Sequence, residues 1–340
     1  MKRLLSAVLV LFGSSVVAFL LIRLAPGDPA LARLGLEADP ASVAAIRRTF
    51  ALDQPIVLQY VHWLSHVVAG DLGRSLQTGR PVLPLILGAL GPTVLLSLAA
   101  LVLSTAIAIP AGVMAASRHE KLSDYLLSLA AICALSVPSF WLGMLLVLAF
   151  TIHLPVLPAS GYVSPVVDPG GFLLHLVLPT LTLGIALAAS SLRITRAAML
   201  EILGADFIRT ARAKGLRRRA VLSRHALPNA MVPIVTLLGL QMGQLFGGVV
   251  VTETLFAWPG LGKLTVDAVF ARDYPVVQGA VLVTATLFLL INLSTDLLYT
   301  RLDARIGSIA GGGASCNRLR PGPMQRRRGR RWVPAPVSAW

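Results

Sequence analysis

Few residues of this chain have the types and spacing that catalysis or metal binding requires. His62 and His66 are four residues apart, which would put two metal ligands on one helix face, but no glutamate lies between them and no third ligand is evident. Gly262-Lys263-Leu264 comes nearest to a phosphate-binding loop, which needs a second glycine five residues before the Gly-Lys pair and a hydroxyl residue after it. Both are absent. We therefore expect no catalytic residue, no metal site, no cofactor and no hydrolysis of ATP by this chain.

Asn292 and Asp296 could act on a passing solute, because they lie one helical turn apart in an apolar stretch. Ionisable side chains inside a membrane tend to face a cavity or a partner helix. Two interpretations stay open for Asp296. It either belongs to a transport pathway, or it lies at the level of the lipid head groups and pairs with a nearby base.

The sequence elements that would position Asn292 and Asp296 are long apolar stretches. The chain is 56% hydrophobic and 13% charged, and a hydrocarbon layer about 30 Å thick is crossed by roughly 20 apolar residues of helix. Six blocks have that length and almost no charge. They cover residues 4–22, 93–116, 126–152, 174–192, 230–251 and 276–298. The sequence therefore predicts an all-α, polytopic membrane protein with six transmembrane helices.

The first block follows Lys2 and Arg3, as in a signal peptide. A cleaved signal has a shorter apolar stretch followed by small residues at an Ala-x-Ala site. This block is long and leads instead into Arg23-Leu-Ala-Pro-Gly-Asp-Pro29. We expect an uncleaved first helix.

Basic residues indicate the orientation, because Lys and Arg in short connections stay in the cytoplasm. They occur in alternate connections: Lys2 and Arg3, Arg118 and Lys121, nine residues within 193–224, and Arg301 and Arg305. The connection 151–173 has no Lys or Arg, and 253–275 has two bases against three acids. We expect both termini in the cytoplasm and these two connections outside.

The net charge of +15 is concentrated in two places. Residues 193–224 carry nine bases and two acids, and the segment 307–340 carries seven arginines and no acid. A basic helix-turn-helix could bind DNA, but membrane spans on both sides argue against it, so we expect no nucleic-acid partner. Attraction to anionic lipid head groups is the simplest alternative. It explains the orientation of the loop and leaves its internal pattern unexplained.

That internal pattern predicts two short helices. Asp206 suits the first turn of a helix, alanine-rich sequence continues it, and Gly215 can take the left-handed conformation that ends it. A second short helix is expected from Arg217 until Pro228 interrupts it, because proline removes an amide donor and clashes with the preceding turn. The loop should form a compact, exposed element on the cytoplasmic face.

This element resembles the cytoplasmic loop signature of ABC importer permeases, which reads Glu-Ala-Ala, three residues, Gly, nine residues, Ile-x-Leu-Pro. Gly215 takes the glycine position and Leu227-Pro228 closes the pattern. Arg209-Thr210-Ala211 stands where Glu-Ala-Ala is usual, and His225 stands where Ile is usual. Arg-Thr-Ala is common in the peptide-importer branch, so the resemblance is to that branch.

Other stretches resemble the same branch, in order, over about the first 306 residues. They are Arg23 to Pro29, Leu52 to Pro55, Tyr60, Trp63-Leu64, Gly70-Asp-Leu-Gly73, Ser75, Pro81-Val82, Ser136-Val-Pro-Ser-Phe-Trp-Leu-Gly143, Glu253-Thr-Leu-Phe-Ala-Trp-Pro-Gly-Leu-Gly262, Arg272-Asp-Tyr-Pro275 and Asn292 to Asp303. The long segment between the first two helices resembles the first of the two permeases of dipeptide and oligopeptide importers.

The resemblance implies the fold of a type I ABC importer permease in the inner (plasma) membrane. Its partners would be a second permease subunit, two cytoplasmic ABC ATPases, an extracytoplasmic substrate-binding protein and membrane lipid. It implies a first helix with an external segment over 1–92 and a permease core over 93–306, with a coupling loop at about 193–228. The remainder, 307–340, is rich in Gly, Pro and Arg, and we expect it to be disordered.

The resemblance also implies which residues act. Contact with the ATPase would come from Arg209, Thr210, Ala211, Lys214, Gly215, Leu216, Leu227 and Pro228. The apolar, turn-rich segment 256–262 could dip towards the membrane and close the pathway from outside. The residue types themselves give the candidates for pathway or gate, which are Pro138, Trp258, Pro259, Gly260, Asn292 and Asp296. Proline bends suit gating elements and also serve helix packing, so both interpretations stay open for Pro138.

Two other classes of protein have different signatures. A free-standing channel or secondary transporter predicts internal repeats and ionisable residues at mid-membrane, and neither is evident by eye. A membrane scaffold or sensor would need no docking loop and no ATPase. Within the importer class, dipeptides, oligopeptides, glutathione and nickel complexes all remain open as substrates.

Overall fold

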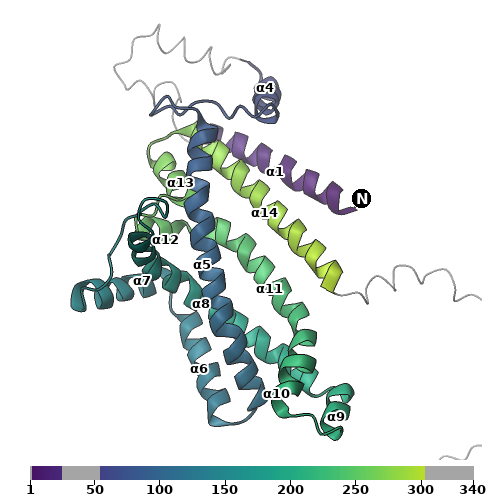
Figure 1. The fold of residues 1–340 in the computed structure, drawn as a ribbon. Helices are drawn as coiled ribbons and strands as arrows, with labels where there is room; N and C mark the ends of the chain where they lie inside the picture. Colours follow the sequence, from purple (N-terminus) through teal and green to yellow (C-terminus); the bar gives the residue numbers. More distant parts are fainter. Residues whose placement is uncertain (1, 25–53, 303–340) are drawn as a thin grey trace, which may run out of the picture. The chain divides into compact units, whose positions relative to one another are not determined.

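A computed structural model describes residues 2–24 and 54–302 of the 340-residue chain (Figure 1). The chain divides into one unit over Met1–Tyr299 and another over Thr300–Trp340. The sequence stretches 25–53 and 303–340, and with them the expected disorder of the basic tail, lie outside the described residues. The helices described below lie in the first unit, except for the last three residues of α14.

Every described element is a helix, apart from a single antiparallel bridge between Arg74 and Pro81. The elements are α1 (Lys2–Leu24), α4 (Ile56–Val68), α5 (Val82–Ser117), α6 (Leu122–Ser136), α7 (Ser139–Val147), the π-helix η1 (Leu148–His153), α8 (Pro169–Leu203), α9 (Asp206–Ala213), α10 (Arg218–Ala220), the π-helix η2 (Val221–Ala226), α11 (Leu227–Gly248), α12 (Val250–Leu255), α13 (Leu261–Phe270) and α14 (Tyr274–Leu302).

The predicted all-α membrane architecture is confirmed. Four described helices are long and apolar enough to cross a bilayer: α5, α8, the run from Arg218 to Gly247 that includes α11, and α14. A bent pair, α6 with α7 and η1, makes a fifth if it is one span. The first predicted block lies in α1, where Ala7–Leu20 forms a shorter apolar stretch. The total of six stays a prediction.

The third predicted span, residues 126–152, is not one straight helix. α6 ends at Ser136 and α7 begins at Ser139, and the two helices differ in direction by 97°. Pro138 accounts for the break, because proline lacks an amide donor and disfavours helical geometry in the residue before it. Val137 is accordingly extended, with φ −87° and ψ 121°.

Pro228 interrupts nothing, and this expectation was wrong. α10 passes into η2 and η2 into α11 without a gap, and Pro228 is the second residue of α11. The preceding turn is a π turn, a wider form that relaxes the hydrogen-bond ladder where proline cannot take part in it. The second loop helix is therefore continuous with the fifth predicted span.

α5 and α8 pack along each other and form the centre of this unit (Figure 1). Their backbones are close because small residues line the contact. A Cβ on Gly112 of α5 would stand 2.6 Å from the Cβ of Thr195 in α8, and one on Gly184 of α8 would stand 2.8 Å from a methyl of Leu103 in α5. The pair connects the two ends of the molecule through a contact that leaves no space for larger side chains.

Candidate functional site

The predicted coupling loop forms a packed element at the end of α5 that lies away from α13 (Figure 1). From α9, the side chains of Ile208 and Ala211 enter a core with Met199 of α8, Val221 of η2 and Ala116 of α5. A helix of eight residues is not stable by itself, so this core fixes its orientation. α9 is therefore packed against residues of both α5 and α8.

The turn that follows α9 contains the glycine that the sequence indicates. Gly215 has φ +76°, a left-handed conformation that is open to glycine and costs other residues about 1–2 kcal/mol. Its amide donates to the Arg212 carbonyl at 2.9 Å and closes the last turn. No atom outside its chain neighbours lies within 4 Å of the position of a Cβ. The backbone conformation, and not a shortage of space, therefore requires glycine here.

The residues implied in coupling form an exposed face and a packed face. Arg209, Thr210, Lys214, Gly215, Leu216 and Pro228 are exposed, Leu227 is half-buried and Ala211 is buried. Sequence reasoning missed Phe207, a residue that is 45% exposed. It lies three residues before Thr210 on the same face of α9, and an aromatic residue in a basic helix was the available signal.

Two side-chain clamps hold this end of the molecule together. Arg218 donates a hydrogen bond to the carbonyl of Ser117, the last residue of α5. Arg196 of α8 donates from Nε and Nη2 to the two carboxylate oxygens of Asp124 in α6, at 2.6 and 2.8 Å. Nδ1 of His119 lies 3.1 Å from the same carboxylate. Asp124 is buried, so this pairing compensates its removal from water.

The candidate gate segment 256–262 is packed at the other end of α5. Trp258 is fully buried, its indole N–H donates to the Pro92 carbonyl at 3.0 Å, and its ring meets that of Tyr162 edge-on at 4.8 Å. Pro259 is exposed. The segment therefore presents only part of its surface to the outside and is anchored by its tryptophan.

Glu253 lies buried beneath this segment. Its carboxylate accepts hydrogen bonds from the Thr93 hydroxyl of α5 at 2.6 Å and from the Lys263 amide at 2.9 Å. A Cβ on Gly260 would stand only 1.9 Å from a carboxylate oxygen, so the turn requires glycine there. Burial raises the pKa of the Glu253 carboxyl above its usual range, and these hydrogen bonds oppose the rise. The segment thus folds around one carboxyl group that also contacts α5.

A second carboxylate joins the connection before α5 to the connection before α14. The side chain of Asp273 accepts hydrogen bonds from the Ser75 hydroxyl and, at 2.9 Å, from the Leu76 amide. The side chain of Gln77 donates to the Ala271 carbonyl at 2.7 Å. We call this set of contacts the outer clamp. It unites two stretches that the resemblance singles out separately, one before α5 and one before α14.

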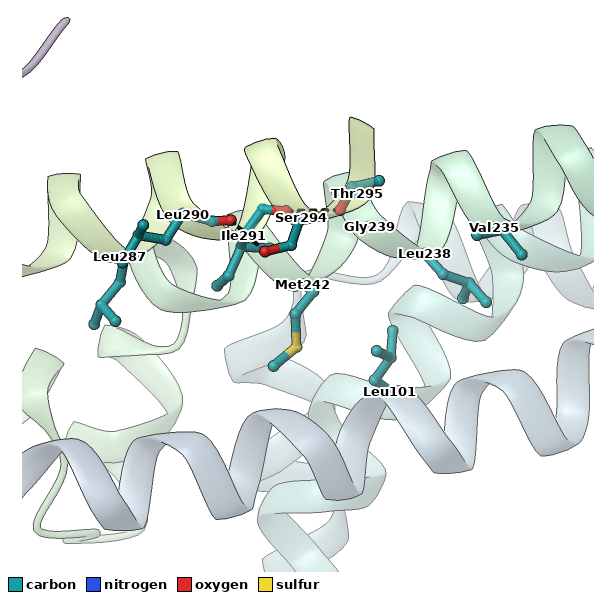
Figure 2. A pocket seen from close by; sticks show the side chains of 10 residues that line it. All are labelled: Leu101, Val235, Leu238, Gly239, Met242, Leu287, Leu290, Ile291, Ser294 and Thr295. Atoms are coloured by element: carbon teal, nitrogen blue, oxygen red, sulfur yellow. Dashed lines mark hydrogen bonds between the residues drawn. The ribbon is translucent and has the colours of Figure 1, made fainter. Parts of the chain in front are cut away.

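A cavity of about 340 Å³ lies between α5, α11 and α14 (Figure 2). It is lined by Leu101, Val235, Leu238, Gly239, Met242, Leu287, Leu290, Ile291, Ser294 and Thr295. The Ser294 and Thr295 hydroxyls donate to carbonyls of their own helix, at 2.7 and 2.8 Å, so the wall is almost wholly apolar. α11 and α14 are in close contact here, because a Cβ on Gly239 would stand 2.1 Å from Thr295.

The pathway candidates lie on different elements. Pro138 is exposed at the break between α6 and α7, and Trp258 is buried at the end of α5. Asn292 is half-buried in α14, with its Oδ1 3.6 Å from the Cβ position of Gly243 in α11. The side chain of Asp296 lies outside the described residues. Within the described part of the chain, no hydrogen bond or ring contact joins Pro138, Trp258 and Asn292.

Sequence reasoning missed three buried carboxylates and their partners. These pairs are Asp124 with Arg196, Glu253 with Thr93, and Asp273 with Ser75. An acid in the first turn of α6 and acids inside otherwise apolar outer segments were the available signals. Their partners are distant in sequence, so only the fold identifies them.

Among the described residues, no third ligand lies beside His62 and His66. Nδ1 of His66 lies 2.8 Å from the carbonyl oxygen of His62 one turn earlier. In residues 54–302 and the described part of α1, no group of three or more His, Cys, Asp or Glu side chains is placed to hold a metal ion.

Long apolar helices, a tightly packed central pair and a basic, packed loop element at one end define a polytopic membrane permease. Residues 108–308 match the family of binding-protein-dependent transport system inner membrane components, and residues 1–97 match the N-terminal model of the same membrane components. The chain belongs to this family.

Curated relatives align over nearly their whole length. A probable peptide ABC transporter permease protein, y4tP, from Sinorhizobium fredii is 44% identical over 306 residues, covering 90% of this chain and 98% of the relative. The glutathione transport system permease GsiC of Escherichia coli K12 is 42% identical, covering 90% and 97%. The dipeptide transport system permease DppB of Alkalihalophilus pseudofirmus is 39% identical, covering 90% and 98%.

A solved structure supports the fold. An inward-facing form of the MetNI methionine ABC transporter superimposes with a TM-score of 0.53 at 18% sequence identity. The match covers 64% of this chain and 96% of the solved chain. At this level of identity the likeness concerns the fold alone.

Proposed function

We propose that this chain is the first of two permease subunits of an ATP-driven importer, and that it forms half of the pathway for peptides or related small solutes. The names of its relatives support peptides, dipeptides and glutathione as the substrate class. The observation that carries the proposal is the construction of the basic loop. Its helix is fixed by a core on one side and is exposed on the other.

The exposed face of α9 is the proposed contact with an ATPase subunit. Phe207, Arg209 and Thr210 would insert into a groove of the ATPase, while Ile208 and Ala211 keep the helix attached to the permease core. ATP-driven closure of the two ATPases then displaces α9 as a rigid body. The displacement reaches α5 and α8 because the core includes residues of both helices.

The close contact between α5 and α8 would carry that displacement to the outer end. There, Thr93 of α5 bonds Glu253 and the Pro92 carbonyl receives the Trp258 indole. Movement of α5 would therefore move the segment 256–262, the proposed outer gate. The cavity between α5, α11 and α14 lies between the two ends and is the proposed widening of the pathway on this subunit (Figure 2).

The orientation is part of the proposal. The basic element would face the cytoplasm, where the ATPases are, and the outer clamp would face the substrate-binding protein. Both termini would then be cytoplasmic, and the chain itself would be non-catalytic.

Purification of the complete transporter tests this function. We expect an affinity-tagged chain to retain a second permease and two ATPase subunits, and the reconstituted complex to hydrolyse ATP faster when a peptide-loaded binding protein is added. A reporter fused at Lys214 should be accessible only from the cytoplasmic side. Transport by the chain without any ATPase, or an external position of that reporter, would refute the proposal.

A further inference from the structure

The charge at the outer end differs from what the sequence composition suggests. The connection between α12 and α14 holds three acids, Glu253, Asp267 and Asp273, against two bases. In the structure Glu253 and Asp273 are buried, and Asp267 pairs with Lys263 at 2.5 Å. The acids are directed inward or already paired, which leaves Arg272 as an exposed cation without a balancing charge in this connection.

Two more arginines belong to the other half of the outer clamp. The Ser75 amide donates to the Arg80 carbonyl at 2.9 Å, and Nη1 of Arg74 donates to the Gly79 carbonyl at 3.1 Å, so both lie on one hairpin. Arg272 lies between Ala271 and Asp273, whose oxygens accept hydrogen bonds from this hairpin. The backbones of all three arginines therefore belong to one hydrogen-bonded unit.

The side chains of Arg80 and Arg272 are exposed, and no described residue gives either of them a hydrogen bond or an ion pair. Arg272 also has φ +55°, a left-handed conformation that is uncommon for residues other than glycine. The end of α13 accounts for this conformation, because the Arg272 amide donates to the Val269 carbonyl at 3.1 Å and the Asp273 amide donates to the Ala268 carbonyl at 2.8 Å. The backbone of Arg272 is therefore fixed next to the outer clamp.

An exposed aromatic residue completes the surface. Phe270, the last residue of α13, is 84% exposed two positions before Arg272. Arginine and aromatic residues are the types that carry most of the binding energy in protein interfaces. We call Arg74, Arg80, Phe270 and Arg272 the outer arginine patch.

The sequence expectation places the patch beyond the bilayer surface. α5 begins at Val82, directly after the hairpin, and the apolar block expected from the sequence begins at residue 93. Eleven residues of helix rise about 16 Å, whereas the head-group layer adds only about 5–8 Å to each side of the hydrocarbon. A soluble protein is therefore favoured over lipid as the partner of these cations.

We propose that the outer arginine patch is the docking surface for an acidic face of the soluble substrate-binding protein, which rests on the proposed function. The exposed arginines steer that partner towards the pathway by long-range attraction, and Phe270 supplies apolar contact once it has docked. The outer clamp joins the hairpin before α5 to the loop before α14 and so positions the arginines of both. A partner bound to the patch therefore contacts both connections at once.

Association of the peptide-loaded binding protein with the complete transporter in lipid nanodiscs tests this inference. We expect Arg80→Gln with Arg272→Gln to slow association about tenfold at low ionic strength, and less at about 1 M salt, where the Debye length is about 3 Å. Arg80→Lys with Arg272→Lys keeps the charge and should stay within about twofold of the wild type. Phe270→Ala should mainly speed dissociation.

Val166→Glu with Val167→Glu is the matched control, because it changes the charge of the outer side by the same two units at residues that are 90% and 81% exposed in the connection before α8. It should leave association unchanged. Equal slowing by this double glutamate variant, or no slowing by the double glutamine variant, would overturn the docking surface, while wild-type stimulation of ATP hydrolysis keeps the proposed function intact. Loss of the second permease from the double glutamine complex would overturn it as well, because the patch would then be a subunit contact.

Discussion

Arg196 and Asp124 are joined by two hydrogen bonds between α8 and α6, although 72 residues separate them in the sequence. The carboxylate is 3% exposed and the guanidinium 27%. The pair lies next to the basic loop element and ties the start of α6 to the helix that leads into it. Removing one partner leaves the other charge poorly solvated.

Asp124→Asn should therefore destabilise the protein by about 3 kcal/mol, measured by thermal or denaturant unfolding in detergent. Asp206→Asn is the matched control. Its partner Arg209 and Asp206 itself are 76% and 94% exposed, so this change should cost less than about 1 kcal/mol. Equal losses in the two variants would contradict the structural role of the buried pair.

Gly112→Val tests the contact between α5 and α8. The new side chain would begin 2.6 Å from Thr195 and 3.0 Å from the Leu192 carbonyl, so we expect a loss of about 1–3 kcal/mol of stability and poor recovery of the folded protein. Gly88→Ala in the same helix has no atom within 4 Å of its Cβ and should be neutral or slightly stabilising. A neutral Gly112→Val would show that the helices are farther apart.

Gly215→Val tests coupling at the end of α9. A β-branched residue in the left-handed conformation costs about 1–2 kcal/mol and should displace the turn. If this cost is taken from the binding free energy between the loop and the ATPase, each 1.4 kcal/mol weakens that binding tenfold. We expect assembly to persist and uptake per ATP hydrolysed to fall about tenfold. Gly204→Ala, at φ −82°, is the control and should transport normally. Normal coupling in Gly215→Val would remove this turn from the mechanism.

Glu253→Gln tests the buried carboxyl through pH. Because the folded-state pKa is raised above the ordinary 4.5, the carboxyl favours folding most below pH 4.5, and this contribution is lost as pH rises through the folded-state value. The stability of the wild type relative to Glu253→Gln should therefore decline as pH rises from about 4.5 towards neutrality. Thermal unfolding of both proteins over that range measures it. A difference that grows with pH would contradict the raised pKa.

Cysteine labelling tests the proposed outer gate. Ala257→Cys and Pro259→Cys are at exposed positions and should react readily, whereas Ala268→Cys, which is 6% exposed in α13, should react slowly. If the segment gates the pathway, ATP should change the rates at 257 and 259 and leave 268 slow. Unchanged rates at all three positions in a transporting complex would exclude the gate.

The positions of most helices follow from the sequence because length and apolarity alone specify a membrane span. The turn after α9 is similarly local, since glycine adopts the left-handed conformation of Gly215 without steric cost. The break at Pro138 was harder to predict. Proline also occurs at positions 110, 179 and 233 inside continuous helices, so its presence alone does not distinguish a break from a tolerated residue.

The outer surface could not be predicted from composition. Counting charges gives the connection before α14 an excess of acids, whereas the fold buries Glu253 and Asp273 and leaves Arg272 exposed. The partners of the buried acids come from α5 and from the hairpin before it. Thr93 and Glu253 are 160 residues apart in the sequence, and Ser75 and Asp273 are 198 apart. The residue pattern within one segment carries no information about partners at such separations.

The outer clamp has a consequence for biosynthesis. Ser75 and Leu76 emerge from the ribosome early, yet their acceptor, Asp273, is made 198 residues later. A chain that ends before Asp273 leaves the Ser75 hydroxyl and the Leu76 amide without this acceptor. The two connections can therefore be joined only after more than three quarters of the protein has been synthesised.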